Sequence, residues 1–266
     1  AITKKDNFVG HSLYKKKFNE EFNMKMLCHG IDISDNDVSC SDSLIQNVEN
    51  SLYKIKEAGA SQALLSNVTG DDIVITAIVE DDNLVEIVNK SIFDVLKESA
   101  LGFDDLNGVG LKREDAGEGI SYVELDLNPN FYPDAVILSF DTYCGQYFVE
   151  NVAKSAVKAA TGMTEVYNIA SSLVDGIKQI PGVGYVSNQT DDPVIVANVT
   201  NVEQIGVVAG AMIGAVLGNK NTYLVKRHTP INVIPGSVIF SATAIMNGNL
   251  IDLAEYFSFR SQILSK

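Results

Sequence analysis

The sequence predicts an α/β protein whose second half forms a Rossmann-like, mostly parallel sheet flanked by helices, preceded by a smaller α+β domain. From about Asp134 onward, short apolar runs alternate with helical patterns, and strands separated by such helices usually pair in parallel through right-handed crossovers. The first half lacks this strict alternation, and the turn-forming Asn128-Pro129-Asn130 marks the change. We therefore expect an N-terminal α+β domain over residues 1–129 and a Rossmann-like ligand-binding domain over residues 130–266.

The N-terminal half contains patterns for three strands and two helices. One helix opens with Ser41 and Asp42, which are good capping residues, repeats apolar residues at helical spacing, and stops at Gly59. The β-branched run IVITAIV predicts a buried strand. The expected elements are strands at residues 25–33, 73–79 and 120–127, helices at 41–58 and 84–96, and a long Gly- and Asp-rich loop at 102–119.

The C-terminal half predicts alternating strands and helices, with no internal repeat. The expected strands are residues 135–140, 165–169, 184–187, 194–198, 222–226 and 238–244, and the expected helices are 146–160, 172–180, 202–217 and a closing helix at 250–263.

Composition limits the function classes. The formal net charge of −14 argues against nucleic acid as a partner, because phosphates require a basic face. The longest apolar run, residues 205–217, is too short to cross a bilayer, and no secretory signal is visible, so we expect no membrane partner. The three widely spaced cysteines, Cys28, Cys40 and Cys144, do not suggest a disulfide framework and fit a reducing cytoplasm.

In an open parallel sheet, the ligand binds beyond the carboxyl ends of the strands. Several expected strands here end in amides, hydroxyls and a few charges, as ordinary polar loops also would. Asp141 follows a buried run and either accepts hydrogen bonds from ribose hydroxyls or caps the next helix. Asn168 competes with it for the ribose or adenine contact.

Other motifs are weak. Gly182 and Gly184 precede a strand, whereas the dinucleotide fingerprint must follow one, and no phosphate-binding GxxxxGK[ST] loop exists. No histidine or cysteine pair has zinc-site spacing, so we expect no metal, and Cys144 as a nucleophile lacks a recognisable histidine partner.

Glycines recur at every fourth residue of the expected helix at 202–217: Gly206, Gly210, Gly214 and Gly218. They share one helix face, which either packs on the sheet or meets another helix across a dimer.

The runs AVILSFDTYCGQYFVENVAKSA and VGYVSNQTDDPVIVANVTN, with the glycine-striped helix, resemble HcgC, a pyridinol methyltransferase family of [Fe]-hydrogenase FeGP cofactor biosynthesis in methanogens. The resemblance covers most of the chain. It implies a Rossmann-like core, a homo-oligomer, S-adenosylmethionine (SAM) as cofactor, and methylation of a ring carbon of a carboxymethyl-pyridinol. The usual glycine-rich methyltransferase motif is absent after Phe140, where Asp-Thr-Tyr-Cys-Gly stands instead.

Methyl transfer mainly requires that the reactants are oriented, and a pyridinolate can be held by hydrogen bonds alone, so polar residues at the strand ends suffice for this activity. On this hypothesis they divide into three groups by role. The cofactor group is Asp141, Thr142, Tyr143, Gln146 and Asn168; the catalytic group is Asn188, Gln189 and Thr190; and the substrate group is Asn198, Thr200, Asn201, Lys226, Arg227 and His228. The last three are the only basic cluster of this half, suited to a carboxylate or simply a solvated turn. The alternatives are an NAD(P)-dependent oxidoreductase and a non-catalytic binding or scaffold protein.

Overall fold

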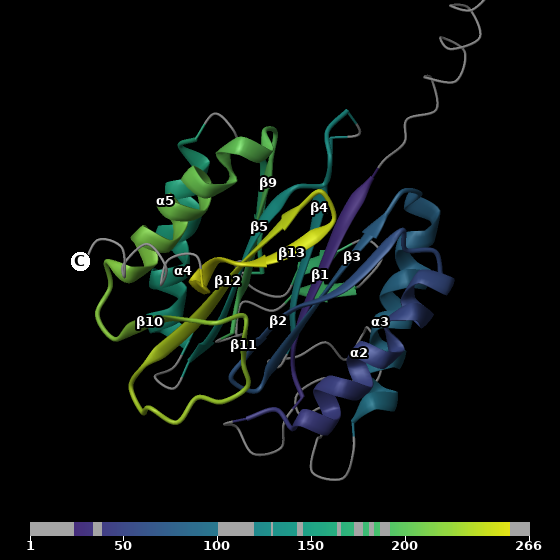
Figure 1. The fold of residues 1–266 in the computed structure, drawn as a ribbon, viewed down its shortest axis with the longest axis horizontal. Helices are drawn as coiled ribbons and strands as arrows, with labels where there is room; N and C mark the ends of the chain where they lie inside the picture. The colour runs from purple at the N-terminus through teal and green to yellow at the C-terminus, as the bar shows by residue number, and fades with distance from the viewer. Residues whose placement is uncertain are drawn as a thin grey trace, which may run out of the picture.

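The protein folds into four layers, with two β-sheets packed face to face and a pair of helices outside each sheet (Figure 1). The computed structural model describes residues 24–33, 39–100, 120–128, 130–142, 146–163, 166–172, 178–180, 184–186 and 192–255. Helices α2 and α3 cover one sheet and α4 and α5 cover the other (Figure 1). Among the described helices, none is long and apolar enough to cross a membrane.

The first sheet has the strand order β11-β2-β3-β1-β4. Its elements are β1 (Lys25–Asp32), α2 (Asp42–Glu57), β2 (Gln62–Thr69), β3 (Asp72–Val79), a short 3₁₀ turn η1 (Asp82–Leu84), α3 (Val85–Ser99), β4 (Ile120–Asp126) and the short β11 (His228–Thr229). All neighbours pair antiparallel except β11, which runs parallel to β2.

The second sheet has the order β10-β12-β5-β9-β6, with β13 added beside β12. Its elements are β5 (Ala135–Thr142), α4 (Gln146–Thr161), β6 (Val166–Ser171), β9 (Val194–Val199), η3 (Val202–Gln204), α5 (Ile205–Leu217), β10 (Thr222–Val225), β12 (Val238–Met246) and β13 (Asn249–Asp252). Strands β7 (Lys178–Ile180) and β8 (Gly184–Val186) form a separate two-stranded ribbon. Only β10 and β12 pair in parallel here.

The two halves repeat one β-α-β-β-α-β unit, the ferredoxin-like arrangement. The strand orders of the two sheets match when β12 is treated as an insertion between β5 and β10. The strand-to-helix junctions are also alike: Asp81 caps η1 at φ −138° and ψ 117°, and Asn201 caps η3 at φ −133° and ψ 116°. These residues are 120 positions apart. When the sequence is aligned with itself at that spacing, DDIVITAIV of residues 71–79 aligns with DDPVIVANV of residues 191–199. The expectation of no internal repeat is therefore wrong.

The α/β class is confirmed, but the mostly parallel, Rossmann-like arrangement is wrong for the described strands. Helix α4 does connect two strands that run in the same direction, β5 and β6. Strand β9 lies between them and pairs antiparallel with both, so each β-α-β unit is split. Helix length alone cannot reveal an intervening strand.

Three local predictions also differ. Strand β2 was not expected, the expected helix at 172–180 ends in strand β7, and β13 lies where the closing helix was expected to begin. The division into two domains at residue 129 stays a prediction. Strand β11, from the second half of the chain, pairs with the first sheet.

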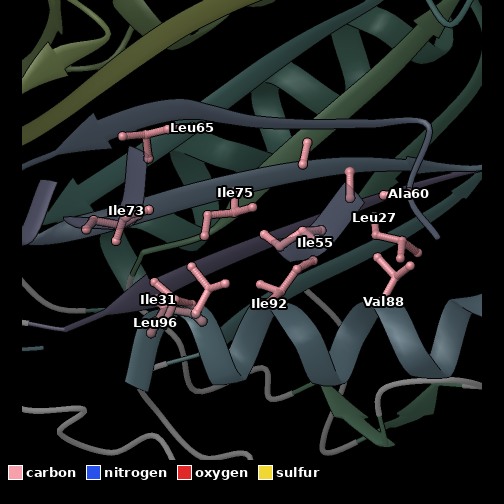
Figure 2. Close-up of a cluster of buried hydrophobic side chains, with 14 of the residues drawn as sticks. Leu27, Ile31, Ile55, Ala60, Leu65, Ile73, Ile75, Val88, Ile92 and Leu96 are labelled. Carbon is pink, nitrogen blue, oxygen red and sulfur yellow. The ribbon is translucent and has the colours of Figure 1, made fainter. Parts of the chain in front are cut away.

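The core has three apolar layers. One lies between the first sheet and its helices, where Leu27 and Ile31 of β1 and Ile75 of β3 meet Val88 and Ile92 of α3 (Figure 2). An equivalent cluster lies beneath α4 and α5, and a third lies between the sheets. Because side chains alternate along a strand, each central strand contributes side chains to one layer that faces the helices and to the layer between the sheets.

Helix α2 begins with a side-chain cap. Ser41 adopts an extended backbone, and its Oγ accepts a hydrogen bond of 3.1 Å from the N–H of Leu44. Removing such a cap costs about 1 kcal/mol. We expect Ser41→Ala to lower the free energy of unfolding by about that amount in urea denaturation, and Ser41→Asp, which keeps an acceptor, to leave it nearly unchanged.

Candidate functional site

The layer between the sheets is apolar along its centre and polar toward β2 and β12. Met26, Cys28 and Val74 of the first sheet meet Ala135 and Ile137 of the second. Burial raises the pKa of the Cys28 thiol to about 12, so this cysteine is an inert part of the packing.

Buried side-chain hydrogen bonds tie the two sheets together. Asn67 of β2 donates through Nδ2 to Ser241 Oγ at 2.7 Å and to Thr243 Oγ1 at 3.0 Å, both on β12. Thr69 Oγ1 lies 2.7 Å from Ser241 Oγ. These bonds fix the position of one sheet on the other, because a buried polar group without a partner costs about 1–3 kcal/mol.

Four aspartates gather at one edge of this layer, and we call them the aspartate cluster: Asp32, Asp72, Asp141 and Asp192. Asp32 ends β1 and is the cross-strand partner of Asp72, which begins β3. Asp192 precedes β9, and continuing the register of Ser139 with Val194 brings it opposite Asp141. Strand alternation directs all four toward the space between the sheets, because Met26 and Cys28, Val74, Ile137, and Val194 share that face.

The cluster follows the internal repeat. Asp72 and Asp192 occupy equivalent positions, 120 residues apart. Asp32 is the last residue of β1, and Asp141 is the last but one of the equivalent strand β5. The four carboxyl groups are therefore two related pairs, one from each half of the chain.

Asp72 is buried among the other carboxylates of the cluster. Its residue is 3% exposed. Burial, followed by the neighbouring carboxylates of Asp192, Asp71, Asp32 and Asp141, raises its pKa well above 3.8. Its Oδ2 has no hydrogen-bond partner within the described part of the chain. A buried carboxyl in this setting favours the protonated form or a bound group that supplies hydrogen-bond donors or positive charge.

The β2–β3 turn and the segment before β12 enclose the cluster. Asn232, itself 3% exposed, donates through Nδ2 to Asp141 Oδ1 at 3.1 Å, and its own Oδ1 accepts from the N–H of Ile234 at 3.3 Å. Gly70 lies so close to Asp141 that a Cβ there would sit 1.3 Å from Oδ2. On the other side, Asp192 Oδ1 accepts a 3.0 Å hydrogen bond from the N–H of Thr142.

The chemistry of this site favours cations and hydrogen-bond donors. A pyrophosphate would be repelled by the carboxylates. No group of three or more metal-ligating side chains in a suitable arrangement occurs in the described ranges. An organic ligand with positive charge suits the site better than an anion.

Among the predicted site residues that the structure describes, Asp141 does not lie near Asn198 and Asn168. Asp141 and Thr142 lie at the aspartate cluster, whereas Asn198 pairs opposite Ala135 at the other end of β5, with Asn168 beside it. Because β5 and β9 are antiparallel, the residues that follow these two strands lie at opposite ends of the strands. Asn198 donates to the Asp134 carbonyl at 2.9 Å.

The remaining predicted residues fall into three groups, of which the basic cluster is described below. Asn201 caps η3 by accepting from the N–H of Glu203 at 3.0 Å, and Thr200 precedes it at the same far edge. Tyr143, Asn188, Gln189 and Thr190, and the side chain of Gln146, lie outside the part of the chain that the structure describes.

The predicted basic cluster already has partners. Lys226 Nζ lies 2.8 Å from Glu255 Oε1 at the surface. Arg227 Nη1 donates to the carbonyls of Leu65 and Ser66 at 3.0 and 3.3 Å, which holds the β2 bulge. Burial and the charge of Arg227 lower the pKa of His228, so this imidazole favours the neutral form. This arrangement does not form an open seat for a carboxylate.

Sequence reasoning missed Asp32, Asp72, Asp192 and Asn232. The signal for two of them was the repeated Asp-Asp before a VI run, at residues 71–72 and 191–192.

Comparison with known proteins gives the family. The model of the family described as "Uncharacterised conserved protein UCP005278" matches residues 25–261. The chain belongs to this family. An "Uncharacterized protein" of Methanothermobacter thermautotrophicus is 53% identical over 241 residues, covering 91% of this chain and 98% of the relative. "Uncharacterized protein MJ1676" of Methanocaldococcus jannaschii is 40% identical over 224 residues, covering 84% and 92%.

Solved structures give only distant likeness. A microcompartment protein from Desulfitobacterium hafniense aligns with a TM-score of 0.25 at 8% identity, covering 74% of this chain and 88% of that one. A putative monooxygenase from Lactobacillus acidophilus aligns with a TM-score of 0.29 at 10% identity, covering 86% and 96%. Similarity at this level gives no evidence about function.

Proposed function

We propose that this family binds a small cationic metabolite at the aspartate cluster and that Asp72 is the residue that holds its charged or donor group. The observation that carries the proposal is the Oδ2 of Asp72, buried without a hydrogen-bond partner in the described structure and surrounded by other carboxylates. A ligand that supplies positive charge relieves their mutual repulsion. The amide of Asn232 and the close approach of the Gly70 backbone complete the enclosure.

Binding of a cation should release a proton. Asp72 carries a raised pKa in the free protein, and an adjacent positive charge lowers it again. Calorimetric titrations in buffers with different enthalpies of ionisation measure this proton release directly.

For the activity, we propose a SAM-dependent C-methyltransferase of the cytoplasm, with a carboxymethyl-pyridinol as the methyl acceptor. The support is the sequence resemblance together with the charge of SAM, whose sulfonium and ammonium groups suit carboxylates. Asp141 and Thr142 are the predicted cofactor residues that lie at the cluster. The acceptor carries a carboxylate, so we place its acid group away from the four aspartates.

The test compares SAM with S-adenosylhomocysteine, which lacks the sulfonium charge. We expect SAM to bind at least about tenfold more tightly, a difference of about 1.4 kcal/mol. Asp72→Asn should weaken SAM binding by about tenfold or more. Asp81→Asn is the matched control, because Asp81 is an exposed cap whose equivalent in the second half is already asparagine. Its affinity should not change.

The outcomes separate the two levels of the proposal. If SAM does not bind but a simple amine such as putrescine or arginine binds in an Asp72-dependent way, the methyl-donor assignment fails and the cation site stands. If no cation binds, or Asp72→Asn binds as wild type does, the site assignment fails. Binding of NADH with blue-shifted fluorescence would favour the oxidoreductase alternative.

A further inference from the structure

The outer face of α5 is apolar and uncovered in the chain as described. Helix α5 contains no polar side chain. Val207 is 56% exposed and Leu217 is 44% exposed. A Cβ built on Gly206, Gly210 or Gly214 would meet nothing within 4 Å. The glycine stripe therefore faces away from the sheet, and the interpretation that it packs on the sheet is wrong.

The repeated half shows what this face looks like when it is solvated. Helix α3 is the equivalent of α5 at the spacing of 120 residues, and its buried Val85, Val88, Ile92 and Leu96 match the buried Ile205, Val208, Met212 and Val216. The equivalents of the exposed Gly206, Gly214, Leu217 and Gly218 and of the half-buried Gly210 are, in that order, Glu86, Asp94, Lys97, Glu98 and Lys90. These positions therefore carry charged side chains on α3, in the first repeat, and none on α5, in the second repeat.

We infer that the outer face of α5 packs against the same face of a second copy of this chain, with the two helices antiparallel about a two-fold axis. Two copies each carrying a net charge of −14 repel one another, and a face without charge is where they can approach. Glycines at every fourth position let the helix backbones come close.

Charge complementarity at the helix ends favours a second copy over an unrelated partner. An axis through the middle of α5, near Ala211, brings Glu203 before one helix to the Lys220 end of the other, twice by symmetry. The antiparallel arrangement also opposes the two helix dipoles. Each glycine costs about 1 kcal/mol of helix propensity relative to alanine, and the association offsets that cost.

The test uses charge substitutions at equivalent positions of the two repeats. Val207→Lys places a charge on the proposed interface, and Ile87→Lys places one at the equivalent, 53% exposed position of α3. Sedimentation equilibrium of the full chain should show a wild-type dimer, a dissociation constant raised about a hundredfold or more by Val207→Lys, and no change with Ile87→Lys.

A second variant guards against misfolding. Gly210→Lys installs the residue that α3 carries at that position, and it improves helix propensity, so thermal melting should show no loss of helix while the dimer dissociates. Near the axis a residue meets its own copy, so Ala211→Cys should form an intermolecular disulfide on mild oxidation, in contrast to wild type. A wild-type monomer at micromolar concentrations, a Val207→Lys variant that stays dimeric, or equal dissociation by Ile87→Lys would each overturn the inference.

Discussion

Gly70→Ala is expected to destabilise the protein by about 3 kcal/mol or more, because one methyl group would collide with a buried carboxylate. Gly70 has a φ of +63°, and an added Cβ would lie 1.3 Å from Asp141 Oδ2 and 2.3 Å from its Cγ. Asp141 cannot move freely, since Asn232 binds its other oxygen and the residue is 4% exposed. The β2–β3 turn or the end of β5 must therefore shift.

The control separates the collision from backbone strain. Gly236 has a φ of +76°, and a Cβ there would meet nothing within 4 Å. Gly236→Ala should cost only the left-handed backbone term of about 1–2 kcal/mol. Urea denaturation of both variants gives the difference.

A double variant identifies the colliding partner. Asp141→Ala removes the carboxylate, so adding Gly70→Ala to it should cost little more than Gly236→Ala costs in wild type. Equal costs of Gly70→Ala with and without Asp141 would show that the contact between the turn and β5 does not determine the stability of this edge.

Asp72→Asn should stabilise the protein at neutral pH by about 1–2 kcal/mol while it weakens ligand binding. The amide keeps the size of the side chain and offers N–H donors to the surrounding carboxylates. Asp72 has a raised pKa in the folded state because of burial and then its acidic neighbours, so the folded state holds this proton more tightly than the unfolded state does. The stability that the proton contributes is fully present below about pH 4 and is lost as pH rises through the folded-state pKa.

The pH dependence checks the sign. Thermal melts across the acid-to-neutral range should show wild type and Asp72→Asn melting close together near pH 4 and diverging as pH increases, with the variant higher. Asp81→Asn, at an exposed position, should follow wild type throughout. A variant that melts below wild type at neutral pH would mean that the Asp72 carboxylate is compensated in the free protein.

Local elements of this fold were predictable, and strand pairing was not. The spacing of apolar residues identified α2, α3 and α5, because an amphipathic helix records its buried face within its own sequence. Strand β2 was missed because its Ser66 and Asn67 bond with other buried polar groups, so that its sequence lacks an apolar run.

The candidate site was predicted only in part, for a topological reason. Asp141 was singled out as an acid at the end of a strand, and the structure places it one residue before the end of β5, beside Asp32 and Asp72 from the other half of the chain. Gly70-Asp71-Asp72 resembles an ordinary turn in sequence, so Asp72 gave no sign of its burial. Asn198 and Asn201 were grouped with Asp141 because parallel strands were assumed, and the antiparallel β9 sends them to the opposite edge.

Fusing two like units into one polypeptide frees their equivalent positions to diverge. In an assembly of identical subunits, every substitution appears twice, so two symmetry-related acids must share one character. Here Asp192 accepts a backbone N–H from Thr142, while the Oδ2 of its counterpart Asp72 has no such bond in the described residues. Asp192 can thus serve as a fixed hydrogen-bond acceptor while Asp72 binds and releases a proton. Two identical chains could not assign different roles to these equivalent positions.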